Sequence, residues 1–245
     1  MKAATLPFAF PLDRQQILRN RARILAALLA SDDAFCRIPC SGMRKETPQR
    51  MLALYDDVFL GGFLAHAYRG LTVTLSSRLT SAAGKFIYSK SPVLRMRQAE
   101  IRMSSDFLTR LTDGPFDLNG LSVATAQEAF LVVFEHELCH ALETALYGQT
   151  GHSERFRQLA YGLFGHTATR HSLPTRKQEA AKDGFLVGSK VSFFYEGKLL
   201  SGTISYIGKT ATVMVPSLFG SYRDRMGRRY DKYRVQLSEL KKSIR

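Results

Sequence analysis

The chain has 245 residues, of which 45% are hydrophobic and 23% are charged, so it can bury one full core and add a small second module. Its three cysteines are too few for a disulfide scaffold, and no apolar run approaches membrane-spanning length. The formal net charge of +14 favours contact with a polyanion, most commonly nucleic acid, and the alternative is a basic surface that serves solubility alone.

The cysteine content and the first residues predict an intracellular protein, either cytoplasmic and at the nucleoid or nuclear, with no membrane partner. Lys2 is followed by a short apolar stretch that Pro7, Pro11 and Asp13 interrupt, which does not match a secretory signal. Scarce cysteines fit a reducing compartment. Cys36 and Cys40 lack a second pair, so we do not predict a structural metal site there.

Residues 1–46 are predicted to form an N-terminal helical extension. Asp13 and Gln16 form an aspartate variant of the capping box and open a helix that runs to about Ala30. Apolar residues recur at helical spacing, so this helix packs on the core and carries a basic face. We interpret that face as solvated, with nucleic-acid contact as the alternative. Its arginines are Arg14, Arg19, Arg21 and Arg23.

The central region, residues 47–166, is predicted to combine two or three strands between Leu71 and Ser104 with a long helix after them. Thr125 with Glu128 forms a capping box, and Gly148 supplies a stop, so we expect the helix to run from about Ala126 to Tyr147. Its first half is apolar all round. The helix should therefore be central and buried.

This helix carries the most informative motif of the chain, His136-Glu137-Leu138-Cys139-His140. Positions i and i+4 share one face of a helix, so the imidazoles of His136 and His140 can bind one metal ion. Glu137 lies about 100° round the axis and can reach a water molecule on that metal. The pattern indicates one catalytic Zn²⁺ and hydrolysis by an activated water, with Glu137 as the catalytic residue. Cys139 is interpreted as a small buried hydrophobe.

Zinc needs a third protein ligand, and His152 is our candidate. The helix ends near Tyr147, and the five residues from Gly148 to His152 are long enough for the chain to fold back to the metal. The alternatives are a carboxylate or another histidine. We interpret each of the other histidines as an ordinary surface or core residue rather than a metal ligand. These rival ligands are Glu154, Glu179, His66, His166 and His171.

At this point the residues resemble a known family, the SprT-like zinc metalloproteases. The resemblance covers about residues 50 to 166 in the family's order, and it departs at Ser153, where the family commonly has glycine. Ser153 can cap the following helix. The matching segments are Leu54 to Gly62, Leu75 to Gly84, Ala99 to Ser104, His136 to Ala141, and Gly151 to Phe156 closing on Phe164-Gly165.

The resemblance implies an α+β zincin-type metalloprotease domain that acts on protein substrates, and it further implies DNA-dependent degradation of proteins crosslinked to DNA. Zinc-peptidase architecture in general led us to expect an extended substrate at the sheet edge near Ala99 to Ser104, by β-augmentation. Tyr161 and His166 are within chain distance for stabilising the oxyanion, and the sequence does not choose between them.

The last part of the chain changes to a period of two. Residues 167–184 are polar and predict a linker, and residues 185–245 predict a basic all-β module that looks like a small SH3-like barrel. From Phe185 to Arg245 there are 12 Lys and Arg against 4 Asp and Glu. Four strands are expected, within residues 187–193, 200–207, 211–215 and 230–235.

One loop of this module interleaves arginines with tyrosines, which suits phosphate contacts and base stacking. We therefore predict a nucleic-acid contact there, with DNA, possibly single-stranded, as the partner; an exposed hairpin tip kept soluble by its charges is the alternative. The candidate residues are Arg223, Arg225, Arg228, Arg229 and Lys232.

Three functions follow from these residues. The first is a zinc protease recruited to DNA, acting on DNA-bound or DNA-crosslinked proteins. The second is a zinc peptidase with no nucleic-acid role. The third is a non-catalytic nucleic-acid-binding protein with a structural zinc. The open coordination position left by three ligands favours an enzyme over the third.

Overall fold

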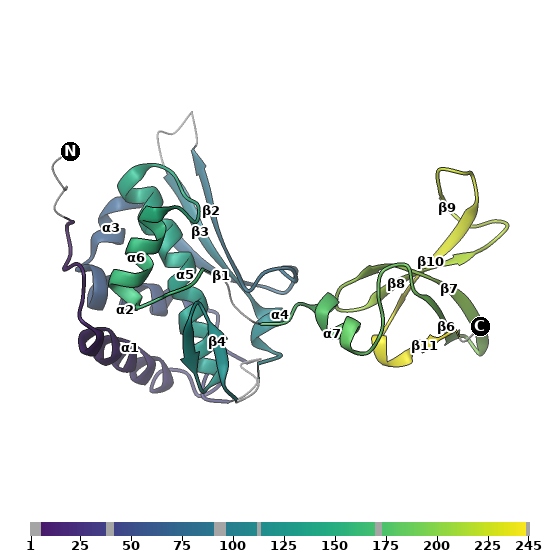
Figure 1. Ribbon diagram of the computed structural model, residues 1–245, viewed down its shortest axis with the longest axis horizontal. Helices are drawn as coiled ribbons and strands as arrows, with labels where there is room; N and C mark the ends of the chain where they lie inside the picture. Colours follow the sequence, from purple (N-terminus) through teal and green to yellow (C-terminus); the bar gives the residue numbers. More distant parts are fainter. Residues whose placement is uncertain (1–5, 38–41, 91–96, 112–113, 170–172, 244–245) are drawn as a thin grey trace. The chain divides into compact units, whose positions relative to one another are not determined.

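The computed structural model describes residues 6–37, 42–90, 97–111, 114–169 and 173–243, and the chain divides into two compact units, Met1–Leu173 and Pro174–Arg245 (Figure 1). Each unit has a hydrophobic core of its own. Cys40 and His171, which entered the sequence-based predictions, lie outside the described residues. Within the described part of the chain, no helix is both long and apolar enough to cross a membrane.

Helices are the main regular structure of the first unit, and the two helices predicted from capping boxes begin at those caps. The box of Asp13 with Gln16 is present at the first helix, and the box of Thr125 with Glu128 is present at the long one. Both helices therefore begin where the sequence predicts. The helices are α1 (Arg14–Leu29), α2 (Thr47–Leu60), α3 (Phe63–Ala67), α4 (Ser105–Leu108), α5 (Ala126–Tyr147) and α6 (Glu154–Phe164).

Helix α5 is the centre of this unit. Sixteen of its 22 residues are buried, as expected for a helix that is apolar around most of its circumference. It ends at Gly148, which adopts the left-handed conformation at φ 73°, and this frees the chain to reverse toward the helix. The ring of Tyr55 packs against Phe134 of this helix, with centroids 5.2 Å apart, and against Phe164 of α6, with centroids 5.9 Å apart.

A three-stranded sheet lies against α5, in the order β1-β3-β2. Strand β3 (Arg97–Ser104) runs parallel to β1 (Leu71–Ser76) and antiparallel to β2 (Gly84–Lys90). Because β3 is paired on both sides, the expected addition of a substrate strand near Ala99 to Ser104 is wrong. The prediction assumed that β3 is an edge strand because it precedes α5 in the chain. In the sheet, however, β3 is the central strand.

The outer side of β1 is already occupied by a side chain. The Val73 backbone N–H donates to Gln49 Oε1 at 2.9 Å, and Gln49 Nε2 donates to the Leu71 carbonyl at 3.2 Å. The amide of Gln49 thus takes the place of a neighbouring strand over this stretch. Such blocking of an edge limits unwanted strand pairing, and it leaves β2 as the outer strand available on the α5 side.

A small hairpin completes the first unit. Strands β4 (Phe116–Leu118) and β5 (Leu121–Val123) pair antiparallel across Asn119 and Gly120, both with positive φ. Positive φ at both central residues is the requirement of a type I′ hairpin turn. This Asn-Gly turn was not predicted from the sequence.

The second unit is a six-stranded antiparallel sheet in the order β11-β6-β7-β8-β10-β9. All four predicted strands are present, and the two shortest, β9 and β11, were not predicted. The SH3-like barrel remains a prediction. The strands are β6 (Lys190–Tyr195), β7 (Lys198–Ile207), β8 (Ala211–Pro216), β9 (Tyr222–Arg223), β10 (Arg229–Val235) and β11 (Lys241–Lys242), with a 3-10 helix, η1 (Leu237–Glu239), between the last two.

Part of the predicted linker, residues 167–184, is helical. Helix α7 (Arg176–Lys182) begins at a capping box formed by Thr175 and Gln178, and its Ala180 is fully buried in the second core. The polar residues that predicted a linker instead form the exposed side of a short helix, which contacts the second core through Ala180. Such a helix is too brief to show an apolar period in the sequence.

Candidate metal centre

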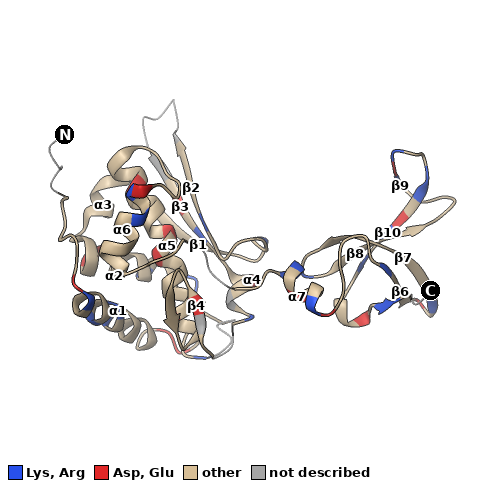
Figure 2. Cartoon of the chain, viewed as in Figure 1, with Lys and Arg blue, Asp and Glu red and all other residues tan. Residues whose placement is uncertain are grey.

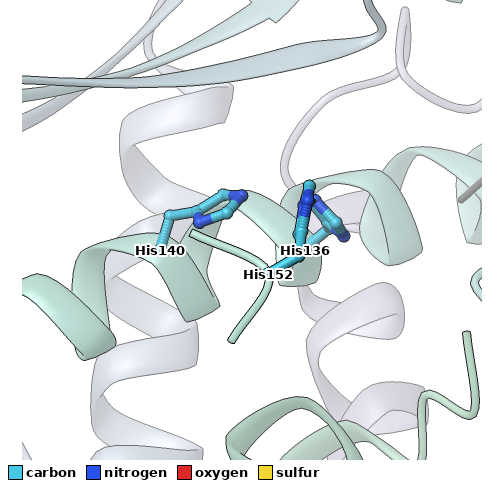
Figure 3. Close-up of side chains that lie close together, drawn as sticks. All are labelled: His136, His140 and His152. Carbon is cyan, nitrogen blue, oxygen red and sulfur yellow. The ribbon is translucent and has the colours of Figure 1, made fainter. Parts of the chain in front are cut away.

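Three histidines converge beside α5. His136 and His140 come from the helix itself, and His152 comes from the segment that returns after Gly148 (Figure 3). Their ring centroids are 5.0 Å apart in each of the three pairs. One ligand nitrogen from each ring lies within 4.8 Å of the others. The structure thus brings together the three residues predicted from the sequence as metal ligands.

The donor set suits a zinc ion. Three imidazoles leave a fourth tetrahedral position for water or substrate, as in catalytic zinc sites. His152 Nε2 lies 3.0 Å from His136 Nε2, close to the separation of about 3.3 Å between two nitrogens bound to one tetrahedral zinc. The arrangement therefore fits this metal with little movement of either side chain.

The surroundings of His140 favour its neutral, metal-binding form. Its Nδ1 lies 2.8 Å from Thr150 Oγ1, and a proton donated there leaves Nε2 free to bind metal. Burial, with a further contribution from His152, lowers the pKa of His140 to about 4. The Phe156 ring packs against all three imidazoles at 4.5 to 5.0 Å and forms an apolar floor.

Glu137 lies beside this triangle and is 7% exposed. Burial raises its pKa to about 7, although a hydrogen bond from the Phe86 backbone acts in the opposite direction. A carboxyl group with a pKa near neutrality can both accept and return a proton at physiological pH. Glu137 is therefore a candidate general base.

A glycine makes room for this carboxyl group. A Cβ added to Gly84 would lie 2.6 Å from Glu137 Cγ and 2.8 Å from Oε1, closer than such atoms approach. Gly84 is the first residue of β2, so the strand can pass directly over Glu137 only because this position has no side chain. Gly84 lies in one of the segments that resemble the family, but its role beside Glu137 was not predicted.

A cavity of about 480 Å³ opens over the histidines and Glu137. One wall is the start of β2, and the opposite wall is α5 with the returning segment. Besides the three histidines and Glu137, it is lined by Ala82, Gly84, Lys85, Phe86, Thr150, Gly151 and Thr169.

A buried ionic network lies immediately before the motif. Glu135, fully buried, accepts two hydrogen bonds from Arg21 of α1, each 2.8 Å, and one of 2.8 Å from the Tyr55 hydroxyl. His166 Nε2 lies 2.9 Å from the same carboxylate. Burial alone would raise the pKa of Glu135, but the charge of Arg21 holds it at about 2. The signal in the sequence for this network is Glu135 itself, an ionisable residue directly after the apolar run of residues 130–134, because a charged group in a buried helix needs partners.

The rival metal ligands lie elsewhere. His166 is buried against Glu135, and His66 Nδ1 is 2.8 Å from the Gly62 carbonyl. The Glu154 side chain is 67% exposed and pairs with Arg157 at 2.9 Å. Glu179 belongs to α7 of the second unit. Neither Tyr161 nor His166, the residues considered for the oxyanion, is among the residues that line the cavity.

Cys139, inside the motif, is fully buried. Burial is the main cause that raises the pKa of its thiol well above the ordinary value, and the neighbouring carboxylates add to it. A thiol in this environment stays protonated and is a poor nucleophile. The structure thus places Cys139 as the small buried hydrophobe that the sequence analysis described.

The five basic residues predicted to contact nucleic acid lie on the second unit, around β9 and the start of β10 (Figure 2). The Lys232 ammonium lies 5.2 Å from the centre of the Tyr222 ring. Arg228 pairs with Asp224 at 2.7 Å, so part of its charge is used within the loop. Arg229 donates to the Gly220 carbonyl at 3.4 Å, while Arg223 and Arg225 are exposed beside them.

Comparison with known proteins agrees with this centre. Neither a curated protein nor a solved structure matches the chain. The SprT-like family matches residues 48–174, a stretch that holds β1 to β5, the three histidines and Glu137 and makes up more than half of the 245 residues. The chain therefore belongs to the SprT-like family.

Proposed function

We propose that the protein is a zinc-dependent protease that hydrolyses peptide bonds through His136, His140, His152 and Glu137. The observation that carries this proposal is the equilateral arrangement of three imidazoles with a buried carboxyl group of raised pKa beside them, all facing one cavity. A bound zinc ion would polarise the attacking water and the substrate carbonyl. Glu137 takes the proton from that water and passes it to the leaving amine.

Strand β2 provides a place for an extended substrate. Its residues Gly84, Lys85 and Phe86 line the cavity, and it forms the side of the sheet opposite the edge that Gln49 blocks. A peptide added along β2 would gain main-chain hydrogen bonds and would pass over Glu137 and the histidines. We therefore propose that the substrate strand pairs with the edge strand β2 and not with the central strand β3.

We further propose that the second unit recruits the protease to DNA, where it acts on DNA-bound or DNA-crosslinked proteins. Support comes from the exposed arginines and from Tyr222, whose ring lies next to Lys232 on the same surface. Arginine and lysine neutralise phosphates, and an exposed aromatic ring can stack with a base. On this proposal the protein acts within the cytoplasm, at the nucleoid, or in the nucleus.

The test of catalysis compares the wild type with Glu137→Gln. Zinc content and cleavage of a DNA-binding protein are measured for both, with and without single-stranded DNA. The proposal expects about one zinc in each protein and cleavage by the wild type alone, since a glutamine amide cannot take a proton from water. Zinc in both proteins and cleavage by neither would instead favour a structural metal.

The test of recruitment uses Arg223→Ala combined with Arg225→Ala. The control for an equal loss of positive charge elsewhere is Lys45→Ala combined with Arg50→Ala, two exposed basic residues of the first unit. Loss of two phosphate contacts should lower the slope of log affinity against log salt by about 1.4 for single-stranded DNA. Cleavage in the presence of DNA should fall with it. If cleavage by the wild type is indifferent to DNA, the protein is a zinc peptidase with no nucleic-acid role.

A further inference from the structure

Glu143 lies on α5 three residues after His140 and has no exposed surface. Residues three apart are neighbours on a helix surface, so Glu143 continues the face that carries the two histidines. Its carboxylate does not point at the metal ligands but at the backbone that returns after the helix. A buried carboxylate needs hydrogen-bond partners, and Glu143 finds them there.

The two oxygens of Glu143 bind the residues on either side of His152. The Gly151 backbone N–H donates to Oε2 at 2.9 Å, and the Ser153 hydroxyl donates to Oε1 through a short hydrogen bond. Hydrogen bonds to an ionised acceptor are stronger than those between neutral groups. The neighbours of the third histidine are thus both held by one side chain of the helix that supplies the other two.

Ser153 also joins this contact to α6. Its Oγ accepts a hydrogen bond of 3.3 Å from the Phe156 backbone N–H, which caps the helix. The Phe156 ring in turn packs on the three imidazoles. Ser153 therefore does more than cap a helix at the position where the family commonly has glycine, because glycine has no hydroxyl to donate to Glu143.

We propose that Glu143 and Ser153 form a clamp that holds His152 in the metal-binding triangle before the metal binds. Both are positioning residues, and the inference rests on the proposed zinc site. Without the clamp, the segment from Gly148 to Ser153 would have to be ordered at the expense of metal affinity. With it, the ordering takes place when the protein folds. Removing such an outer partner typically weakens metal binding about 10- to 100-fold.

Zinc affinity tests the clamp directly. Competition with a chromophoric chelator is measured at a temperature well below unfolding for the wild type, Glu143→Ala, Glu143→Gln and Ser153→Ala. We expect affinity to fall about 10- to 100-fold in Glu143→Ala and by less in Ser153→Ala, which keeps the Gly151 contact. Glu143→Gln should recover part of the loss, since its amide oxygen can still accept from Gly151.

The matched control is Thr144→Ala, a truncation of the next buried residue on the same helix, whose hydroxyl has no hydrogen-bond partner among the described residues. It should leave zinc affinity within about twofold of the wild type, because the hydrogen bonds of Glu143 to Gly151 and Ser153 are intact. Like Glu143→Ala, it truncates a buried side chain of α5, so it shows how much that truncation alone affects zinc binding. Equal losses in Thr144→Ala and Glu143→Ala would overturn the proposal.

Amide hydrogen exchange at Gly151 in the metal-free protein gives a second readout that needs no zinc. The rate should rise at least tenfold in Glu143→Ala relative to both the wild type and Thr144→Ala. An unchanged rate would overturn the clamp. If the wild type binds no zinc, the proposed metal site fails while Gly151 exchange still decides whether the clamp exists. If Glu143→Ala does not fold, Ser153→Ala still tests the clamp through zinc affinity, which should fall below that of Thr144→Ala; equal affinities would overturn the proposal.

Discussion

Replacing Glu137 by glutamine should stabilise the metal-free protein, and the gain should grow with pH. The pKa of Glu137 is raised to about 7 from 4.5 because burial disfavours the charged carboxylate. Between these two values the folded state holds a proton that the unfolded state has released. Stability is therefore complete below pH 4.5 and declines as pH rises toward 7.

The size of the effect follows from the same two values. A pKa difference of one corresponds to about 1.4 kcal/mol, so the buried carboxylate costs about 3 kcal/mol at pH 8 and about 1 kcal/mol at pH 5. Glutamine has nearly the same shape and carries no charge at either pH. Glu137→Gln should thus raise the free energy of unfolding by about 3 kcal/mol at pH 8 and by about 1 kcal/mol at pH 5.

The assay is urea unfolding of chelator-treated protein at both pH values, with slopes checked to be equal. Glu46→Gln is the control, because Glu46 is exposed and makes no capping hydrogen bond, and its effect should be small at both pH values. A stability difference between Glu137→Gln and the wild type that is the same at pH 5 and pH 8 would refute the reasoning. Zinc must be absent, since its charge would favour the carboxylate.

Three further predictions concern the same region. Gly84→Ala should lower proteolytic activity at least tenfold with zinc content unchanged, because the new Cβ would lie 2.6 Å from Glu137 Cγ; full activity would show that β2 can shift. Arg21→Met should lower the free energy of unfolding by about 3–5 kcal/mol by leaving the buried Glu135 without its arginine, and adding Glu135→Leu should recover much of it; simple additivity in urea unfolding would contradict this. Zinc at 100 times its dissociation constant should stabilise the metal-free protein by about 2.7 kcal/mol in calorimetry, and His152→Ala should abolish this shift at the same zinc concentration.

Local signals in the sequence predicted much of the candidate metal centre. The capping box of Thr125 and the stop at Gly148 set the ends of α5 correctly, because these signals act on residues three or four apart. The spacing of His136 and His140 follows from helix geometry alone, and the reach from Gly148 made His152 the candidate for the third ligand.

Contacts between distant segments were not predictable in the same way. The pairing of Arg21 with Glu135 joins residues 114 apart, and the order of the sheet, with β3 in the middle, depends on the packing of the whole unit. The role of Gly84 requires knowing that β2 passes over Glu137. A glutamate at 143 on the histidine face was visible in the sequence, but its partners lie on a segment whose course only the structure gives.

The ion pair between Arg21 and Glu135 shows that the residues matched by the family and the residues needed for a stable fold are not the same. The family matches residues 48–174, whereas the guanidinium that neutralises the residue before His136 comes from α1. A fragment trimmed to the matched residues would keep every proposed ligand, yet Glu135, next to the first of them, would keep only Tyr55 and His166 as partners and would lose the guanidinium that lowers its pKa. We therefore expect a stable metal-binding fragment of this chain to need α1 as well as the matched residues.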